Sequence, residues 1–309
     1  MKPQDSTPPT HVSSQTQESE SANESLESLL ARLETSAVQK EDTTFNREEL
    51  KDIITKLEQD IADGNWIKAD YAKTDFKMMP VLVEQANRKY PEMKLKYAMT
   101  PQDFALSVKE AVENGVEASR YIVNTKERGI HFAVIDQRTI DDKTSLIFFE
   151  PTTLNNMNPA MLALRTQMAI ESYQLPHCHF SMVEMDIQRS SSECGMFSLA
   201  LAKKLHIESE KLTRMHKDNI NGVLCKKDSA LSSDKLDTYL PPSFYKHTQS
   251  KRRLKEYMQS NPEAGNEKVN KKGETLPERF DKSLVTTQEK TVSVSQHRKR
   301  VTEYKSIMM

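Results

Sequence analysis

The stretch RSSSECG, residues 189–195, places a cysteine between a strand-like run, CHFSMVEMDI at 178–187, and a helix-like run, MFSLALAKKL at 196–205. The first amides of a helix have no partner inside the helix, and the helix dipole adds partial positive charge there, so both stabilise a thiolate. The three serines of the stretch are expected to cap this helix. Because a single cysteine at a helix start is more often a small buried residue, the interpretation of Cys194 as a nucleophile depends on the residues upstream.

Two upstream residues complete a candidate catalytic set. His131 opens the apolar strand HFAVID and Glu150 ends the next strand, TSLIFFE, so hairpin-like pairing would bring the two side chains together at one end of a sheet. A histidine beside a thiol accepts its proton, and a carboxylate behind the histidine fixes the tautomer. Gln188 lies at the end of the intervening strand, where its amide can donate to an oxyanion. Each position alone has a structural explanation, but the order His, Glu, Gln, Cys predicts a cysteine-based active site.

This order and spacing resemble the clan of cysteine proteases that includes the ubiquitin-like-protein proteases and adenain. The stretches GIHFAVID, KTSLIFFEP, MDIQRSSSECGMFSLALAKKL, DKLDTYLPPSFYKHTQ and VNKKGETLPERFD together resemble the YopJ family of bacterial type III secreted effectors, over residues 50–305. Proteins of this family use a protease-like triad to acetylate serine, threonine and sometimes lysine on host proteins. The resemblance implies that Cys194 is the nucleophile, His131 the base, Glu150 its orienting acid and Gln188 the candidate oxyanion donor.

Helix-like and strand-like segments alternate along the chain, which predicts a mixed α/β (α+β) fold with αβα layering. Strands are expected around KLKYAMT, YIVN, HFAVID and SLIFFEP, followed by the strand that leads to Gln188. Helices are expected from Asn46 to Gly64, over 75–91 with Pro80 as a local interruption, and over 101–114. A further helix, MLALRTQMAIESY, is expected to take Asn158 as N-cap and Pro159 as its first-turn proline.

The resemblance adds a domain organisation to this pattern. A cysteine-protease-like core over 92–207 is expected beside a helical, basic regulatory region, built from residues 46–91 and from residues 208–309. Residues 1–45 contain 14 Ser or Thr, eight acidic and three basic residues, with apolar side chains clustered only in LESLLARL at 26–33. Such a segment cannot bury enough surface to offset its ordering entropy, so we expect a disordered leader for type III secretion.

A coenzyme site of a standard glycine-rich type is not expected. The seven glycines are too dispersed for a GxGxxG motif, a P-loop or the Q/RxxGxG loop of histone-type acetyltransferases. The phosphates of coenzyme A must therefore meet side chains, and guanidinium groups suit them. The resemblance implies an acetyl-coenzyme A site formed by His131, Arg189, Ser190, Gln249, Ser250, Lys251 and Arg252, and a two-step transfer through acetyl-cysteine.

Positive charge is concentrated at the C-terminal end, although the net charge of the chain is −1. Residues 246–309 contain 15 Lys or Arg against eight Asp or Glu. The usual meaning of such a run is a solvated face, and the segment lacks the interleaved aromatic residues of nucleic-acid-binding proteins. The resemblance implies a different partner, inositol hexakisphosphate, as an allosteric activator. Its expected ligands are Lys204, Leu205, His206, Ile207, Lys246, His247 and Arg279.

Other features of the composition argue against a disulfide scaffold, a metal site, a membrane span and a Sec signal. Three cysteines without framework spacing do not indicate a disulfide scaffold. The triplet His177-Cys178-His179 has no second ligand pair at zinc spacing, and strand alternation sends Cys178 away from its neighbours, so no metal site is expected. The sequence contains no run of eighteen apolar residues and no apolar segment of a Sec-type signal near its start. Neither a membrane span nor a Sec signal is therefore expected.

Three classes of function remain open at this stage. The first is an acetyltransferase effector, secreted by a type III system into the host cell cytoplasm. The resemblance implies that its targets are host MAP kinase kinases and related kinases. The second is a deubiquitinase or SUMO-type cysteine protease, since the triad alone does not distinguish attack on a thioester from attack on an isopeptide. The third is an inert kinase-binding module, against which the intact triad argues.

Overall fold

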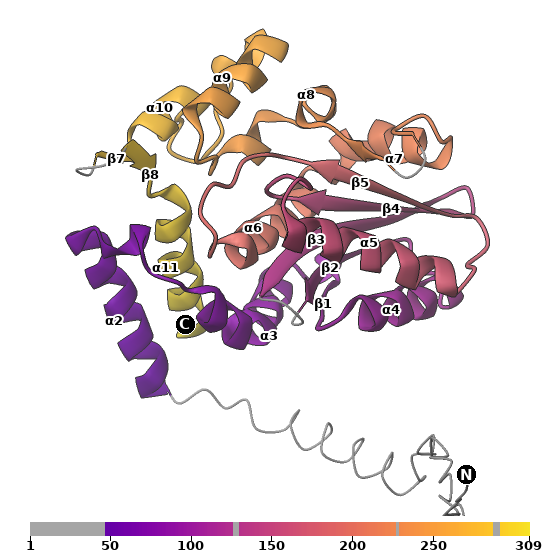
Figure 1. The fold of residues 1–309 in the computed structure, drawn as a ribbon, viewed down its shortest axis with the longest axis horizontal. Helices are drawn as coiled ribbons and strands as arrows, with labels where there is room; N and C mark the ends of the chain where they lie inside the picture. The colour runs from indigo at the N-terminus through magenta and orange to yellow at the C-terminus, as the bar shows by residue number, and fades with distance from the viewer. Residues whose placement is uncertain (1–46, 126–129, 227–228, 287–290) are drawn as a thin grey trace, which may run out of the picture. The chain divides into compact units, whose positions relative to one another are not determined.

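The computed structural model describes residues 47–125, 130–226, 229–286 and 291–309. Residues 47–309 form one compact unit built on a six-stranded sheet with helices on both faces (Figure 1). This arrangement confirms the predicted mixed α/β class with αβα layering. The predicted leader over 1–45 lies outside the described residues, and the other domain boundaries stay a prediction. Within the described ranges, no helix is long and apolar enough to cross a lipid bilayer.

The main sheet has the order β1-β2-β3-β4-β5-β6. Strands β2, β3 and β4 form an antiparallel meander, while β1 pairs parallel with β2, β5 with β4, and β6 with β5. The antiparallel pairing of β3 with β4 puts the start of β3 and the end of β4 at the same end of the sheet. The strands are β1 (Leu95–Ala98), β2 (Ala118–Thr125), β3 (His131–Ile140), β4 (Lys143–Glu150), β5 (Cys178–Glu184) and β6 (Ala230–Leu231).

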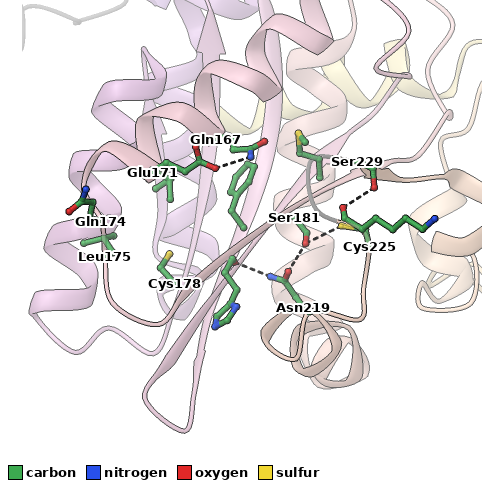
Figure 2. Close-up of a pocket in the computed structure, with 15 residues that line it drawn as sticks. Gln167, Glu171, Gln174, Leu175, Cys178, Ser181, Asn219, Cys225 and Ser229 are labelled. Carbon is green, nitrogen blue, oxygen red and sulfur yellow. Dashed lines mark hydrogen bonds between the residues drawn. The ribbon is translucent and has the colours of Figure 1, made fainter.

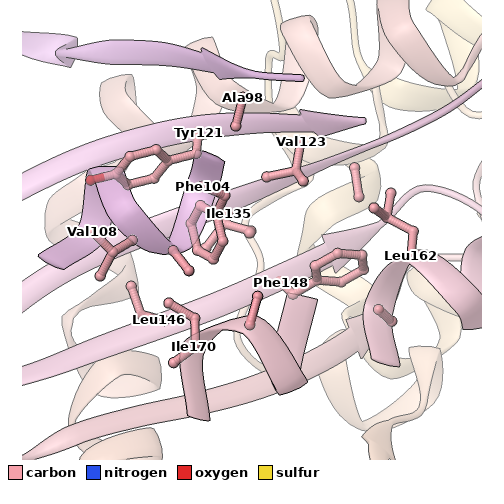
Figure 3. Close-up of a cluster of buried hydrophobic side chains, with 14 residues drawn as sticks. Ala98, Phe104, Val108, Tyr121, Val123, Ile135, Leu146, Phe148, Leu162 and Ile170 are labelled. Carbon is pink, nitrogen blue, oxygen red and sulfur yellow. The ribbon is translucent and has the colours of Figure 1, made fainter. Parts of the chain in front are cut away.

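Helices α4 (Pro101–Glu113) and α5 (Met157–Ser172) cover one face of the sheet. Their inward side chains, including Phe104, Leu162 and Ile170, pack against alternate residues of β2, β3 and β4 such as Tyr121, Ile135 and Phe148 (Figure 3). All of these side chains are at most 5% exposed. This core packs the meander against two helices and so fixes the relative position of its strand ends.

The start of α5 differs from the prediction. The helix begins at Met157 with Asn156 as its N-cap, two residues before the predicted cap Asn158, and the Asn156 side chain makes no capping hydrogen bond. Pro159 lies in the first turn as predicted, where its missing N–H costs no helical bond. The sequence pair Asn-Pro pointed to a cap, but Asn158 already has helical neighbours on both sides.

Helix α6 (Cys194–Ile207) packs on the opposite face of the sheet, against β3 and β2, and α3 (Ala72–Lys89) lies against it. The predicted interruption at Pro80 is wrong, because α3 runs through it. A proline inside a helix removes one hydrogen bond and costs about 3 kcal/mol. Met78, Met79 and Leu82 around it are at most 1% exposed, so their burial offsets this cost.

The C-terminal part of the chain continues beside the sheet and returns to the N-terminal helices. Its last helix, α11, packs against α2, α3 and α6 (Figure 1). Helix α2 ends before Gly64, which has φ +73° and allows the left-handed turn there, as predicted. The remaining elements are α2 (Arg47–Asp63), α7 (Thr213–Ile220), α8 (Ser233–Leu236), α9 (Lys251–Ser260), α10 (Leu276–Asp281), the hairpin β7 (Leu284–Thr286) and β8 (Thr291–Ser293), and α11 (Ser295–Ile307).

Candidate active site

The structure brings His131 and Glu150 together at the end of the β3–β4 pair, as the strand pattern predicted. The His131 Nε2 atom lies 2.8 Å from Glu150 Oε2. The other carboxylate oxygen, Oε1, accepts hydrogen bonds from the backbone N–H and the hydroxyl of Thr152, both at 2.9 Å. Glu150 is fully buried and His131 is 6% exposed. Both Glu150 oxygens are therefore occupied, and the imidazole is held in one orientation.

The imidazole of His131 also interacts with the side chain of Cys194. Burial alone would lower the pKa of His131, but the negative charge of Glu150 and the contact with Cys194 raise it to about 10. At neutral pH the imidazole is therefore protonated.

Cys194 is the first residue of α6, the position that the sequence pattern indicated. The predicted caps are wrong: the N-cap is Glu193, and it makes no side-chain capping bond. Of the three serines, Ser190 donates to Glu193 Oε2 at 2.7 Å and Ser192 donates to the Ala69 carbonyl at 3.3 Å. Ser190 thus ties the segment before the helix to the N-cap residue, and Ser192 ties it to the backbone at Ala69.

Gln188 lies beside this segment and is 4% exposed. Its Nε2 donates to the Ser190 carbonyl at 2.6 Å, while its Oε1 is buried without a partner in the structure. One N–H of the amide is therefore engaged in the loop, and the role of Gln188 as an oxyanion donor stays a prediction.

A pocket of about 640 Å³ opens next to His131. Four residues of the predicted coenzyme set line it: His131, Arg189, Ser190 and Arg252. The first and the last of these are 121 residues apart in the sequence. Arg189 holds the Asp186 carboxylate with both terminal nitrogens, at 2.7 and 3.0 Å, and Arg252 reaches the same carboxylate at 3.4 Å. A fork that holds a carboxylate in this way also fits a phosphate. The donor set therefore suits the phosphates of coenzyme A.

The other predicted coenzyme residues are placed differently. Gln249 holds the pocket wall, because its Oε1 accepts from the backbone N–H groups of Arg189 (2.6 Å) and Ser190 (3.1 Å). The Ser250 hydroxyl caps α9 by accepting from the Arg253 N–H. Lys251 is exposed in the first turn of α9 and does not line the pocket. Sequence reasoning missed Asp186, which lies two residues after the end of β5 with φ +52° and whose carboxylate both arginines contact.

A second, basic pocket of about 570 Å³ lies between α6, α3 and α11. Four of the seven predicted polyanion ligands line it: Lys204, Ile207, Lys246 and His247. Five lysines that the sequence reasoning did not name line it as well: Lys89, Lys203, Lys268, Lys271 and Lys299. Their concentration in one concavity, from five separate segments, makes the pocket suitable for a ligand with many negative charges.

Like charges lie close together in this pocket, and the pKa values of its residues reflect their repulsion. Burial, and then the neighbouring Arg279 and Lys204, lower the pKa of Lys246 to about 8. The same causes hold the pKa of His247 well below its usual range. Arg279 lies close to the rim, since Arg279 and His247 both contact the hydroxyl of Ser295, at 3.3 and 2.8 Å. An anion in the pocket relieves this repulsion.

Two predicted ligands, Leu205 and His206, do not line the basic pocket. The Leu205 side chain is fully buried. The His206 ring packs on Tyr90, with the ring centroids 5.8 Å apart. The helical period explains this outcome, since Lys204 and Ile207 are three residues apart on one face of α6 and the two residues between them point elsewhere.

A third pocket, of about 490 Å³, lies beside β5 and contains the other two cysteines (Figure 2). The thiol of Cys225 donates to Ser181 Oγ at 3.3 Å, and Ser181 donates to Asn219 Oδ1 at 2.6 Å. Burial raises the pKa of the Cys178 thiol to about 11. Cys178 is therefore a neutral thiol at physiological pH. Among the residues that the structure describes, no cluster of three or more His, Cys, Asp or Glu could hold a metal ion.

Comparisons with known proteins identify relatives of this chain. A family profile described as YopJ serine/threonine acetyltransferase matches residues 50–306. The chain is 56% identical over 264 residues to the serine/threonine-protein acetyltransferase YopJ of Yersinia pestis, and equally to that of Yersinia pseudotuberculosis; each alignment covers 85% of this chain and 92% of the relative.

Two solved structures are similar over most of the chain. AvrA delL154 with IP6 and CoA is 53% identical, with a TM-score of 0.83, and the match covers 86% of this chain and 99% of that one. HopZ1a in complex with IP6 and CoA shares the fold at 20% identity and a TM-score of 0.64, over 78% of this chain and 86% of that one. The family profile covers nearly the whole described part of the chain, and the alignment to YopJ covers 85% of the chain. This chain therefore belongs to the YopJ family of serine/threonine acetyltransferases.

Proposed function

We propose that this protein transfers the acetyl group of acetyl-coenzyme A to serine and threonine hydroxyls of host signalling kinases, such as MAP kinase kinases, through acetyl-Cys194. Lysine amines are further acceptors, and modification of the kinases blocks their activation. The observation that carries the proposal is the contact of a protonated, Glu150-bound His131 with Cys194 at the start of α6, beside a pocket with two arginines. The arginine pocket and the family favour acetyl transfer over the protease alternative.

The proposed reaction has two steps, acetylation of Cys194 and transfer of the acetyl group to the acceptor. The Cys194 thiolate attacks the thioester carbonyl, the carbon bond to the coenzyme sulfur breaks, and coenzyme A leaves as a thiol with a proton from His131. Acetylation removes the negative charge beside His131, so the pKa of the imidazole falls and it becomes a base. It then takes the proton of the acceptor hydroxyl, whose oxygen attacks the acetyl carbon and releases Cys194. Gln188 and the first amides of α6 stabilise the oxyanion of each step.

The two pockets have separate roles in this proposal. Arg189 and Arg252 bind coenzyme A phosphates, and Gln249 holds the backbone that carries Arg189. Inositol hexakisphosphate binds the lysine-rich pocket between α6, α3 and α11 and activates the enzyme. The related structures of AvrA and HopZ1a contain both ligands, which supports this assignment. Since the relatives are effectors of the YopJ family, we also propose type III secretion into the host cell cytoplasm.

Intact-mass spectrometry of the protein with acetyl-coenzyme A, quenched in acid, tests the intermediate. We expect the mass of one acetyl group on the parent protein, and its loss in Cys194→Ala together with loss of acetyl transfer to a kinase. Cys178→Ala is the matched control and should keep both. Full transfer by a folded Cys194→Ala protein would show that the mechanism is wrong.

A further inference from the structure

Helix α5 is apolar on two opposite sides, and only one of them is buried. Its inner side, including Leu162 and Ile170, belongs to the core (Figure 3). On its outer side Met157, Leu164 and Met168 are 66%, 51% and 59% exposed. Contiguous exposed apolar patches usually mark interaction sites.

The outer residues form a continuous line, which we call the methionine stripe: Met157, Met161, Leu164 and Met168. The intervals of four, three and four residues keep all of them on one helix face. This is the spacing with which one helix receives the apolar seam of another. Methionine is flexible and polarizable, and it is common on surfaces that accommodate partners of different sequence.

The stripe starts at the active-site pocket. Met157 lines this pocket together with Asn158 and Pro159 of the same turn, and His131 and Arg189 line it as well. A molecule that lies along the stripe therefore also covers the opening of the active-site pocket. A second copy of the chain, or a permanent partner, would block the entry of coenzyme and acceptor there. The acceptor of a protein acetyltransferase, by contrast, must reach this mouth in every turnover.

We propose that the methionine stripe is the docking surface for the acceptor protein. An apolar helix face of the acceptor packs along α5, and the neighbouring hydroxyl-bearing segment enters the pocket beside His131. The inference rests on the proposed acetyl transfer to protein hydroxyls and deepens it: specificity for a protein comes from α5, and the chemistry comes from the triad.

The double variant Leu164→Gln with Met168→Gln tests the stripe without changing a residue that lines the pocket. The probes are the purified catalytic domain of a MAP kinase kinase and a short peptide that copies its activation loop, each with acetyl-coenzyme A and inositol hexakisphosphate. Because a few well-packed apolar contacts contribute most of the binding energy of an interface, the KM for the kinase domain should rise roughly 10–100-fold. The kcat, the rate with the peptide, the affinity for coenzyme A and the melting temperature should stay at the parent values. Val223→Gln, at a residue 67% exposed and outside the stripe, is the matched control.

Calorimetric binding of the kinase domain to Cys194→Ala protein, with and without the two stripe substitutions, measures docking independently of chemistry. Weaker binding in the substituted protein supports the proposal even if no acetyl transfer is detected, in which case the proposed function fails by itself. An unchanged KM and unchanged binding overturn the proposal. A parent dimer that becomes monomeric in the double variant, measured by light scattering, also overturns it, because the stripe is then a self-association surface. Equal losses with kinase and peptide overturn it too.

Discussion

At the scale of single residues, the His131–Glu150 pair controls the protonation of the site. Removal of the imidazole from water opposes its positive charge, but the carboxylate and the thiol outweigh this and raise the pKa to about 10. Since the ordinary value is near 6.5, the pair contributes stability that is fully present below pH 6.5. This contribution is lost as pH rises through 10. The same charge that stabilises the fold therefore also keeps the nucleophile beside a cation at neutral pH.

Glu150→Gln should separate the charge of this carboxylate from its hydrogen bonding. The amide can still contact His131 and Thr152, so we expect a folded protein that keeps some activity, with kcat lower by roughly 10²–10⁴-fold because the imidazolium loses its counter-charge. The stability difference between parent and variant should be largest below pH 6.5 and should shrink as pH approaches 10. Urea denaturation at several pH values measures it. A difference that does not change with pH would contradict the assignment of the charge to this pair.

At the scale of elements, the start of α6 is held by helices from both ends of the chain. A Cβ atom at Gly195 would lie 3.1 Å from Met79 Cε and 3.3 Å from Asp75 Cβ, so any side chain there would require α3 to shift slightly. From α11, Arg300 binds both carboxylate oxygens of Asp75 at 2.8 and 2.9 Å and donates to the Ser192 carbonyl at 2.9 Å. Arg300 and Asp75 are fully buried. The segment before Cys194 is thus tied to α3 and α11 together.

Arg300→Gln should test this tie. It leaves Asp75 as a buried charge without its partner, so the free energy of unfolding should fall by about 3–5 kcal/mol. Lys305→Gln on the same helix removes a charge from an exposed pair with Glu58 and should cost at most about 1 kcal/mol. Urea denaturation with coenzyme-free protein measures both. Similar losses of unfolding free energy in the two variants would mean that the buried Arg300–Asp75 pair stabilises the fold no more than the exposed Lys305–Glu58 pair does.

At the scale of the whole molecule, the basic pocket collects charge from α3, α6, α11 and the loops between them. In the protein without a bound anion these cations repel one another, and this repulsion contributes to the lowered pKa of Lys246. Between pH 8 and 10.5 the unfolded chain binds a proton at this lysine that the folded protein has lost, so this group makes the free protein more stable as pH rises through that range. A polyanion should reverse the effect by restoring the charge.

Binding of inositol hexakisphosphate should therefore take up a proton at Lys246 above pH 8 and weaken with rising salt. Hydrogen bonds to charged groups contribute about 1.5–3 kcal/mol each, so Lys246→Glu with Arg279→Glu should lower the affinity at least about 100-fold and slow acetylation. Calorimetry in buffers of different ionisation enthalpy measures affinity and proton uptake. Lys255→Glu, at an exposed residue of α9 outside the pocket, is the matched control. Unchanged affinity in the double variant would refute the site, and full acetylation without polyanion would refute the switch.

The sequence by itself determined the mixed α/β class, the order of the strands along the chain and the positions of His131, Glu150 and Cys194. These follow from local pattern, because side-chain alternation and helix starts depend on neighbours a few residues away. The resemblance supplied the family and its ligands. Only the tertiary structure decided that Glu193 is the N-cap, that α3 continues through Pro80, and that Lys89 and Lys299 share a pocket with Lys204. The reason is physical: these features depend on packing between segments up to 210 residues apart, and local periodicity contains no information about which distant segments meet.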